Sequence, residues 1–320
     1  MQRSNNTASL VEAGILSALA IIFALISIYI PLMGIFMNFI WPVPLIILGV
    51  RHGLRWSGLA LVTSGIIIAI LANPLQSLFL IVGLGFIGLT LGWSIRKGSP
   101  TMVILGLGSI ASFISKIAVF AMLFSFMGIN PLEINTETGA RATESVLDFY
   151  RSVGMSEYQI EHNKAEIVSL LELLKIALPA VIIMGAFADT FINFWVAKKI
   201  LRRLGTFIPD LPAFRELVLP LPIVLFYGLS LIALYFFSEQ PTVAAYYRIS
   251  VNFNLLCAAL LMLQGLAVAW FYIHKHNWPG FLRGVLLTSL FITQLVPVTI
   301  VFLGIADSFL DFRKLRPQRC

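Results

Sequence analysis

The stretch from Thr101 to Met127, TMVILGLGSIASFISKIAVFAMLFSFM, carries one charged residue, Lys116, near its middle. A helix needs about 20 consecutive apolar residues to cross the ~30 Å hydrocarbon core of a bilayer, at ~1.5 Å per residue. This stretch is therefore long and apolar enough to span a membrane. A charge at that depth costs roughly 3 kcal/mol on insertion scales, so we expect Lys116 to face protein and either to have a partner or to line a path.

Apolar stretches of this kind recur along the whole chain. Of its 320 residues, 59% are hydrophobic and 12% are charged, whereas a soluble domain has about a quarter charged residues. We predict an all-α, polytopic membrane helical bundle with eight or nine transmembrane helices, embedded in the lipid bilayer. The candidate spans are Leu10–Ile30, Phe39–Val50, Gly53–Ala72, Pro74–Ile95, Thr101–Met127, Ile176–Val196, Leu217–Phe237, Ile249–Ile273 and Leu282–Ala306.

The second candidate span is the least regular one. It is short and contains Pro42 and Pro44, so it is expected to be broken or partly re-entrant. A proline inside a membrane helix frees backbone groups that neighbouring helices or a wet cavity must satisfy. We therefore expect this segment to lie among the other helices of the N-terminal half.

The basic residues set the expected orientation. The net charge is +7, and the Lys and Arg residues lie in short clusters between the apolar runs. Lys and Arg accumulate on the cytoplasmic side of membrane proteins, so the pattern predicts a cytoplasmic N-terminus rather than a nucleic-acid partner. Nine full spans would place Arg313, Lys314, Arg316 and Arg319 outside, which leaves eight and nine spans both open.

Two hydrophilic segments divide the chain. Residues 128–175 form an acidic outer loop, in which Ser156 and Gln159 have capping-box spacing and Gly154 is a helix stop. We predict a helical hairpin there, which is either a lid over an outward-facing site or an ordinary connection. A basic, proline-punctuated stretch then follows residue 198. The predicted domains are therefore 1–203, a membrane core with its outer helical loop, and 204–320, a cytoplasmic linker with C-terminal membrane helices.

Motifs for catalysis or cofactors are weak in this sequence. The glycines of the stretches Gly83–Gly88 and Gly106–Ala111 have dinucleotide-like spacing, but they lie in apolar spans without the acid that such a site needs. Spacing of this kind also permits close helix packing. Neither cysteine lies in a metal-binding pattern, and no serine, histidine and acid motif is evident. We expect no enzyme activity, no cofactor and no metal site.

The candidate site is built around Lys116. Ser112 precedes it by one helical turn, so both lie on one face. Asp189 in the following span lies at a similar depth, with Asn193 one turn further on. We predict that Lys116 and Asp189 meet in the interior, with Ser112 and Asn193 beside them. Two interpretations are open: a structural ion pair, or a ligand-binding pair in which Lys116 faces an anionic group of a solute.

The first span carries a row of small residues that includes Ala13, Ser17 and Ala20. Small residues at helical spacing let another helix approach closely. The row indicates either intramolecular packing or a docking face for a partner membrane subunit.

Two stretches carry a family resemblance. The opening Leu10–Ala20, LVEAGILSALA, resembles the first helix of the substrate-binding (S) components of energy-coupling factor vitamin transporters. The stretches Pro42–Gly53 (PVPLIILGVRHG) and Gly304–Arg313 (GIADSFLDFR) resemble the uncharacterised YybS-type bacterial membrane family, which is distantly similar to S components. The resemblance implies a protein of the bacterial inner membrane, with an S-component-like six-helix N-terminal core and an outward-opening pocket.

The same resemblance implies partners. An S component binds a solute and has no ATPase of its own, so a transmembrane coupling subunit with its ATPases would dock on Ala13, Ser17 and Ala20. The chain departs from the S-component pattern in its additional C-terminal helices and in lacking a vitamin-specific signature.

The function expected from the sequence is a small-solute binding or transport component of the membrane, with the solute unknown. A non-transporting membrane scaffold or assembly factor is the alternative. A membrane enzyme acting on lipid is a third possibility, with no catalytic motif in its favour.

Overall fold

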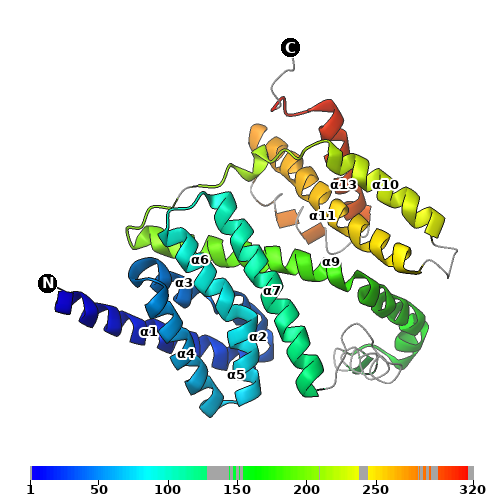
Figure 1. Ribbon diagram of the computed structural model, residues 1–320. Helices are drawn as coiled ribbons and strands as arrows, with labels where there is room; N and C mark the ends of the chain where they lie inside the picture. The colour runs from blue at the N-terminus through cyan, green and yellow to red at the C-terminus, as the bar shows by residue number, and fades with distance from the viewer. Residues whose placement is uncertain are drawn as a thin grey trace. The chain divides into compact units, whose positions relative to one another are not determined.

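The structure is a computed structural model that describes residues 2–127, 144, 147–148, 151, 154–208, 210–237, 244–279, 281, 284–285, 288–289 and 295–315. Within these residues the chain is helical and contains no β-strand, as Figure 1 shows. The elements are α1 Gln2–Tyr29, α2 Pro31–Ile40, α3 Val43–His52, α4 Leu54–Leu71, α5 Pro74–Leu80, the π-helical turn η1 Ile81–Gly85, α6 Phe86–Arg96, α7 Thr101–Met127, α9 Glu157–Arg203, the 3₁₀ turn η2 Phe214–Glu216, α10 Pro222–Phe237, α11 Ala244–Lys275 and α13 Leu295–Leu310.

The helices confirm the predicted polytopic membrane bundle. Six helical segments of the described chain are long and apolar enough to cross a bilayer: Ser9–Tyr29, Leu54–Leu71, Pro74–Arg96, Thr101–Phe126, Leu173–Arg203 and Ala245–Lys275. Three shorter apolar helical segments, Phe36–His52, Pro222–Phe237 and Leu295–Leu310, fall where the other three spans are predicted. Most of the first part of the predicted last span, except residues 284–285 and 288–289, lies outside the described residues.

The chain forms two compact units. Unit 1 contains Met1–Gly139 and Ile182–Asp210, and unit 2 contains Ala140–Val181 and Leu211–Cys320. Helix α9 contributes its second part to unit 1 and its first part to unit 2. The predicted division after residue 203 lies close to one of these junctions, but residues 140–181 group with the C-terminal helices rather than with the N-terminal core.

The proline-containing second span is broken, as the sequence predicts. The predicted span contains the last residues of α2 and most of α3, and the two helices are separated at Trp41 and Pro42. The indole Nε1 of Trp41 donates a hydrogen bond of 3.0 Å to the carbonyl oxygen of Ala20, near the middle of α1. Residues 43–50 of α3 are all buried, so the helix break is sheltered by protein, which is the condition that backbone at membrane depth must meet.

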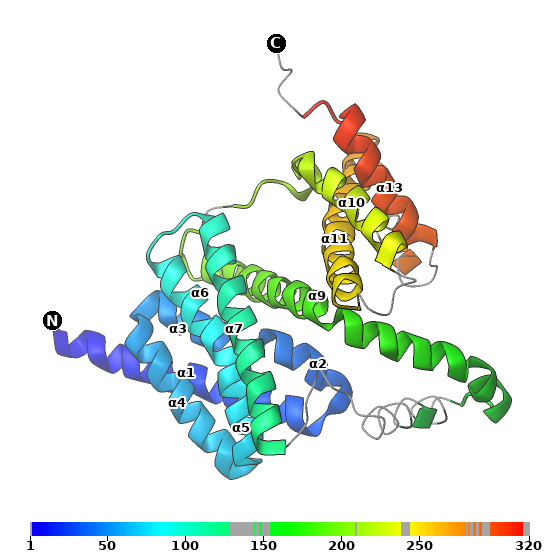
Figure 2. The same ribbon diagram turned by 45° about the vertical axis from the view of Figure 1, so that its right-hand side comes forward.

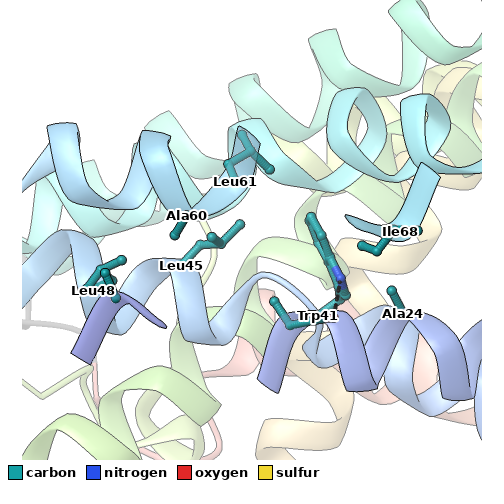
Figure 3. Close-up of a cluster of buried hydrophobic side chains, with 9 residues drawn as sticks. Ala24, Trp41, Leu45, Leu48, Ala60, Leu61 and Ile68 are labelled. Carbon is teal, nitrogen blue, oxygen red and sulfur yellow. Dashed lines mark hydrogen bonds between the residues drawn. The ribbon is translucent and has the colours of Figure 1, made fainter. Parts of the chain in front are cut away.

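Trp41 lies in the apolar core of unit 1. Its fully buried side chain packs in a cluster with Ala20 and Ala24 of α1, Leu45 of α3 and Ile68 of α4. Figure 3 shows the indole between α1 and α4, with the hydrogen bond at its nitrogen drawn as a dashed line. Burial of such a side chain is worth about 1.5–3 kcal/mol in water. In a membrane the main gain is close packing.

Glycines bring α3 and α6 into direct backbone contact. A Cβ placed on Gly92 would lie 3.1 Å from the Cα of Gly49, and one placed on Gly88 would lie 3.2 Å from the carbonyl oxygen of Pro42. Gly88 belongs to the stretch with dinucleotide-like spacing. Gly88 lies inside α6, so the spacing of these glycines permits close helix packing.

Unit 2 is built on a similarly tight crossing, between α11 and α13 (Figure 2). A Cβ on Gly265 of α11 would collide with the carbonyl oxygen of Ile300, and one on Gly304 of α13 would collide with that of Leu261. Asn252 of α11 also holds the first part of α9. Its side chain donates to the carbonyl oxygen of Ile176 at 2.7 Å and accepts from the amide of Ala180 at 2.8 Å.

Helix α9 corrects one detail of the predicted outer hairpin. The second helix of the predicted hairpin is not separate from the sixth span, because α9 runs without interruption from Glu157 to Arg203, through Pro179. Gly154, the predicted stop, has the positive φ of 90° that favours glycine. The first helix of the hairpin is predicted from an apolar stripe between Val146 and Val153, and most of this stretch lies outside the described residues.

The end of α9 is held by an acidic residue in the linker that follows. Asp210 receives hydrogen bonds from Arg202 and from Lys198. These two interactions, the one with Arg202 first, hold the pKa of the exposed Asp210 carboxyl below its ordinary value of 3.8.

Candidate functional site

Helix α7 has one apolar face and one polar face, in the arrangement expected of a membrane helix. Ile110, Ile114 and Ile117 are about half exposed, whereas Ser112 and Ser115 are buried. The exposed isoleucines suit hydrocarbon, and the hydroxyls are turned toward protein. Lys116 is partly buried and lies at the edge of the polar face.

The polar face of α7 packs against the second part of α9, and two glycines permit the contact. A Cβ on Gly108 of α7 would lie 2.5 Å from Cγ2 of Thr190 in α9. A Cβ on Gly185 of α9 would lie 3.6 Å from Cε of Lys116. The aliphatic stem of Lys116 therefore crosses α9 at Gly185, and its amine reaches the next turn, where Asp189 lies.

Lys116 and Asp189 form an ion pair, which confirms the predicted meeting of these two residues. The Lys116 Nζ contacts Asp189 Oδ2 and donates to Ser112 Oγ at 3.2 Å. Ser112 in turn donates to the same carboxylate oxygen over 3.5 Å. Each of the three groups thus contacts the other two.

The pair is neither sealed from its surroundings nor saturated with hydrogen bonds. The Lys116 side chain is 25% exposed and the Asp189 side chain 12%. A lysine ammonium has three donors, and the structure shows two acceptors for it, Ser112 and Asp189. Among the residues that the structure describes, nothing else accepts from Lys116, so a third donor and the accessible surface remain for another group.

Asn193 is the fourth predicted residue, and its amide is half satisfied. It is fully buried, and its Nδ2 donates to the carbonyl oxygen of Asp189 at 2.8 Å. Its Oδ1 has no hydrogen-bond partner among the described residues, and the same is true of the buried hydroxyls of Ser109 and Ser115 on α7. Leaving a buried polar atom unsatisfied costs about 1–3 kcal/mol. Such atoms therefore indicate a water or ligand that would complete them.

Unit 2 contains an ion pair that, unlike the pair of Lys116 and Asp189, is buried on both sides. Arg313 and Asp307 have side chains that are 0% and 2% exposed. Arg313 Nη2 donates to Asp307 Oδ2 at 2.7 Å, and its guanidinium also donates to the carbonyl oxygens of Arg215 and Leu217, at 2.7 and 2.8 Å. Gln264 of α11 adds a bond of 3.0 Å to Asp307 Oδ2. This closed network ties the segment before α10 to α11 and α13, which is a structural role.

The Arg313 network does not follow from local sequence reasoning. Asp307 and Arg313 are near neighbours at a helix end, where a solvated charge cluster is the simplest interpretation. Asp307 also accepts a hydrogen bond from Gln264, which is 43 residues earlier in the chain and lies on another helix. A polar side chain inside the apolar α11 is the one signal that points to a partner across the crossing.

A second arrangement that the sequence did not indicate connects α1 to α3. His52 Nδ1 lies 2.7 Å from Ser9 Oγ, and His52 Nε2 lies 2.7 Å from Glu12 Oε2. Arg51 holds the other carboxylate oxygen of Glu12 at 2.9 Å. A serine, a histidine and an acid therefore lie in a row. Since Ser9 and Glu12 are one turn apart on α1, the row fastens the last residue of α3 to the first half of α1.

The predicted docking face of α1 is occupied by the chain's own helices. Ala13, Ser17 and Ala20 are all buried, and Ala13 and Ala20 belong to the core cluster with residues of α3 and α4. Docking of a partner subunit on this row stays a prediction. Intramolecular packing, the other interpretation of the small residues, accounts for their burial.

The helices and the internal ion pairs define a polytopic helical membrane protein. The chain belongs to the family described as "Predicted membrane protein (DUF2232)", whose model matches residues 18–308. A relative is the uncharacterised protein YybS of Bacillus subtilis (strain 168), which is 25% identical over 304 residues, covering 94% of this chain and 96% of the relative. The resemblance to the YybS-type family is thereby confirmed. No solved structure matches the chain, and the resemblance to S components stays a prediction.

Proposed function

We propose that this protein binds a small solute within the membrane and serves as the solute-recognising component of a transport process. The observation that carries the proposal is the accessible, incompletely satisfied ion pair between Lys116 and Asp189. Ionisable residues inside membrane spans are costly and generally mark a solute or ion path. The sealed pair of unit 2 illustrates what a purely structural pair in the same chain looks like.

The chemistry of the site suits a solute with an anionic group. The free donor of Lys116 would bind that group, while Asp189 and Ser112 hold the amine in place. An additional donor on the solute, or a water that it orders, would satisfy Oδ1 of Asn193. A zwitterion would use both charges of the pair, its anionic group at Lys116 and its cationic group at Asp189.

The transport part of the proposal rests on the resemblance of the first helix to S components. Such a component works with a transmembrane coupling subunit and ATPases. Because Ala13, Ser17 and Ala20 are buried, a coupling subunit would meet the outward face of α1, where Leu10, Ile15 and other large apolar side chains are more than half exposed.

The experiment is a thermal-shift screen of the purified full chain against vitamins, nucleosides and amino acids. A solute that stabilises the wild type should lose its effect with Lys116→Met, and it should keep its effect with Lys199→Met. Lys199 is an exposed lysine at the end of α9 whose amine lies over the ring of Trp195, so the control removes the same charge elsewhere.

A second variant guards against misfolding. Lys116→Met leaves the carboxylate of Asp189 unpaired, whereas Lys116→Met with Asp189→Leu removes both charges, and replacement of a buried pair by apolar residues is frequently neutral or stabilising. We expect the double variant to fold and to bind no solute. Undiminished solute binding by this variant would refute the proposed site. Stable copurification with a partner and no solute response would favour a membrane scaffold.

A further inference from the structure

An open, shallow cavity of about 480 Å³ lies at one end of unit 1, and its lining does not include the residues of the Lys116 site. It lies between the turn that joins α3 to α4 and the end of α6, and its lining includes Arg55, Arg96 and Lys97. This is the end at which His52 meets α1, the end that the charge bias assigns to the cytoplasm. The lining residues contain several cations and no carboxylate.

The cations of the cavity are not neutralised within the described chain. Glu12 contacts the lining residue His52, and its other carboxylate oxygen is held by Arg51. Arg96 makes a weak contact of 3.4 Å with the carbonyl oxygen of Val50, and Lys97 lies 5.2 Å from the ring centroid of Trp93. Neither interaction offsets the positive charge.

The backbone adds to this positive field. Helix α4 starts at Leu54, directly in the lining, and no side chain caps its N-terminus. The first amide groups of a helix and its dipole favour an anion at that position. Gly53 has a φ of 98°, and a Cβ on it would lie 3.2 Å from Nη1 of Arg96. Glycine thus provides the turn and lets the guanidinium of Arg96 lie against the backbone.

The other lining residues indicate what kind of molecule carries the anion. Trp56 and Trp93 line the cavity, and tryptophan is enriched at the level of lipid headgroups. Leu54 is 48% exposed beside them. Basic pockets between membrane helices on the cytoplasmic side bind the headgroups of acidic lipids.

We propose that this cavity binds a phosphate group, carried in the membrane by the headgroup of an acidic phospholipid. Arg55, Arg96 and Lys97 supply the charge, the start of α4 supplies backbone donors, and the two tryptophans contact the glycerol region. The cavity consists of α3, α4 and α6, whereas the solute site consists of α7 and α9, so the two proposals can fail separately.

The test measures lipid binding to the purified full chain by native mass spectrometry. Phosphatidylglycerol is compared with phosphatidylcholine, and inorganic phosphate is tested as a competitor. The variant Arg55→Gln, Arg96→Gln, Lys97→Gln is compared with the control Lys199→Gln, Arg203→Gln, Lys275→Gln, which removes three charges at other helix ends. At about fivefold per basic residue, the cavity variant should bind phosphatidylglycerol about a hundredfold more weakly than the wild type.

Four outcomes decide the proposal. Preference for phosphatidylglycerol that the cavity variant loses and the control keeps supports a lipid headgroup. Binding of inorganic phosphate with the same dependence, and no lipid preference, supports a phosphate site that takes a soluble ligand. Equal losses in both variants would mean that net charge, and not the cavity, attracts the lipid, and this would overturn the proposal. Absence of binding to any phosphate probe would overturn it as well.

A charge-conserving variant guards against structural damage. Arg55→Lys with Arg96→Lys retains the cations, so it should retain most of the binding, although lysine loses the bidentate geometry of arginine. Thermal unfolding without added lipid shows that each variant is folded. Loss of binding in this variant equal to that of the triple glutamine variant would argue against an electrostatic site.

Discussion

Replacement of Arg313 by methionine tests the contrast between the two ion pairs most directly. The side chain of Arg313 is fully buried and that of Asp307 nearly so. Methionine would leave the Asp307 carboxylate with Gln264 as its remaining interhelical partner, and it would remove the donors from the carbonyl oxygens of Arg215 and Leu217. The removal of one partner of a buried pair costs about 3–5 kcal/mol. We expect a loss of that size in the free energy of unfolding.

The double variant separates the charge from the hydrogen bonds. Arg313→Met with Asp307→Leu leaves no unpaired charge, so the loss should shrink to about 1–3 kcal/mol, the cost of the unsatisfied carbonyl groups. The double variant is therefore expected to be more stable than the single one.

The assay is denaturant-induced unfolding of the full chain in detergent micelles, followed by circular dichroism. Lys314→Met is the matched control, because it removes a neighbouring exposed charge and should change stability by no more than about 0.5 kcal/mol. If Arg313→Met is as stable as this control, or if the double variant is no better than the single one, the assignment of a sealed structural pair is wrong.

Three further predictions concern helix contacts and pH. Gly265→Ala should lower the free energy of unfolding by about 1–3 kcal/mol or more, because the new Cβ would collide with a backbone carbonyl of α13 that cannot rotate away. Gly228→Ala is the control, because a Cβ there meets no other atom and should leave the stability unchanged. Thermal unfolding compares the two variants. Asn252→Ala should lower the free energy of unfolding by about 1–3 kcal/mol, and it should speed the hydrogen exchange of the α9 amide that the Asn252 side chain binds. The hydrogen bond from Arg202 is the largest cause of the lowered pKa of Asp210. The contribution of the Asp210 carboxylate to stability is therefore complete above pH 3.8 and is lost as the pH falls through the lowered pKa. Wild type and Asp210→Asn should therefore differ in stability at neutral pH and converge in acid.

The sequence by itself determined the class of this protein and most of its spans. Length and apolar composition decide whether a segment enters a bilayer, and both can be read without knowing a neighbour. The pairing of Lys116 with Asp189 was also within reach, because consecutive spans run antiparallel and helical rise converts residue number into depth. The broken second span followed from Pro42 and Pro44 in the same way.

Only the tertiary structure decided which helix faces meet. Membrane helices are apolar on almost every side, so the pattern that marks the inward face of a soluble helix is weak here. For that reason the burial of Ala13 and Ala20 inside unit 1, the reach of Gln264 to Asp307, and the convergence of Arg55 with Arg96 could not be derived from spacing. Each of these contacts joins helices that are far apart in the sequence. The close approach of glycines that brings such helices together is a property of the packed backbone.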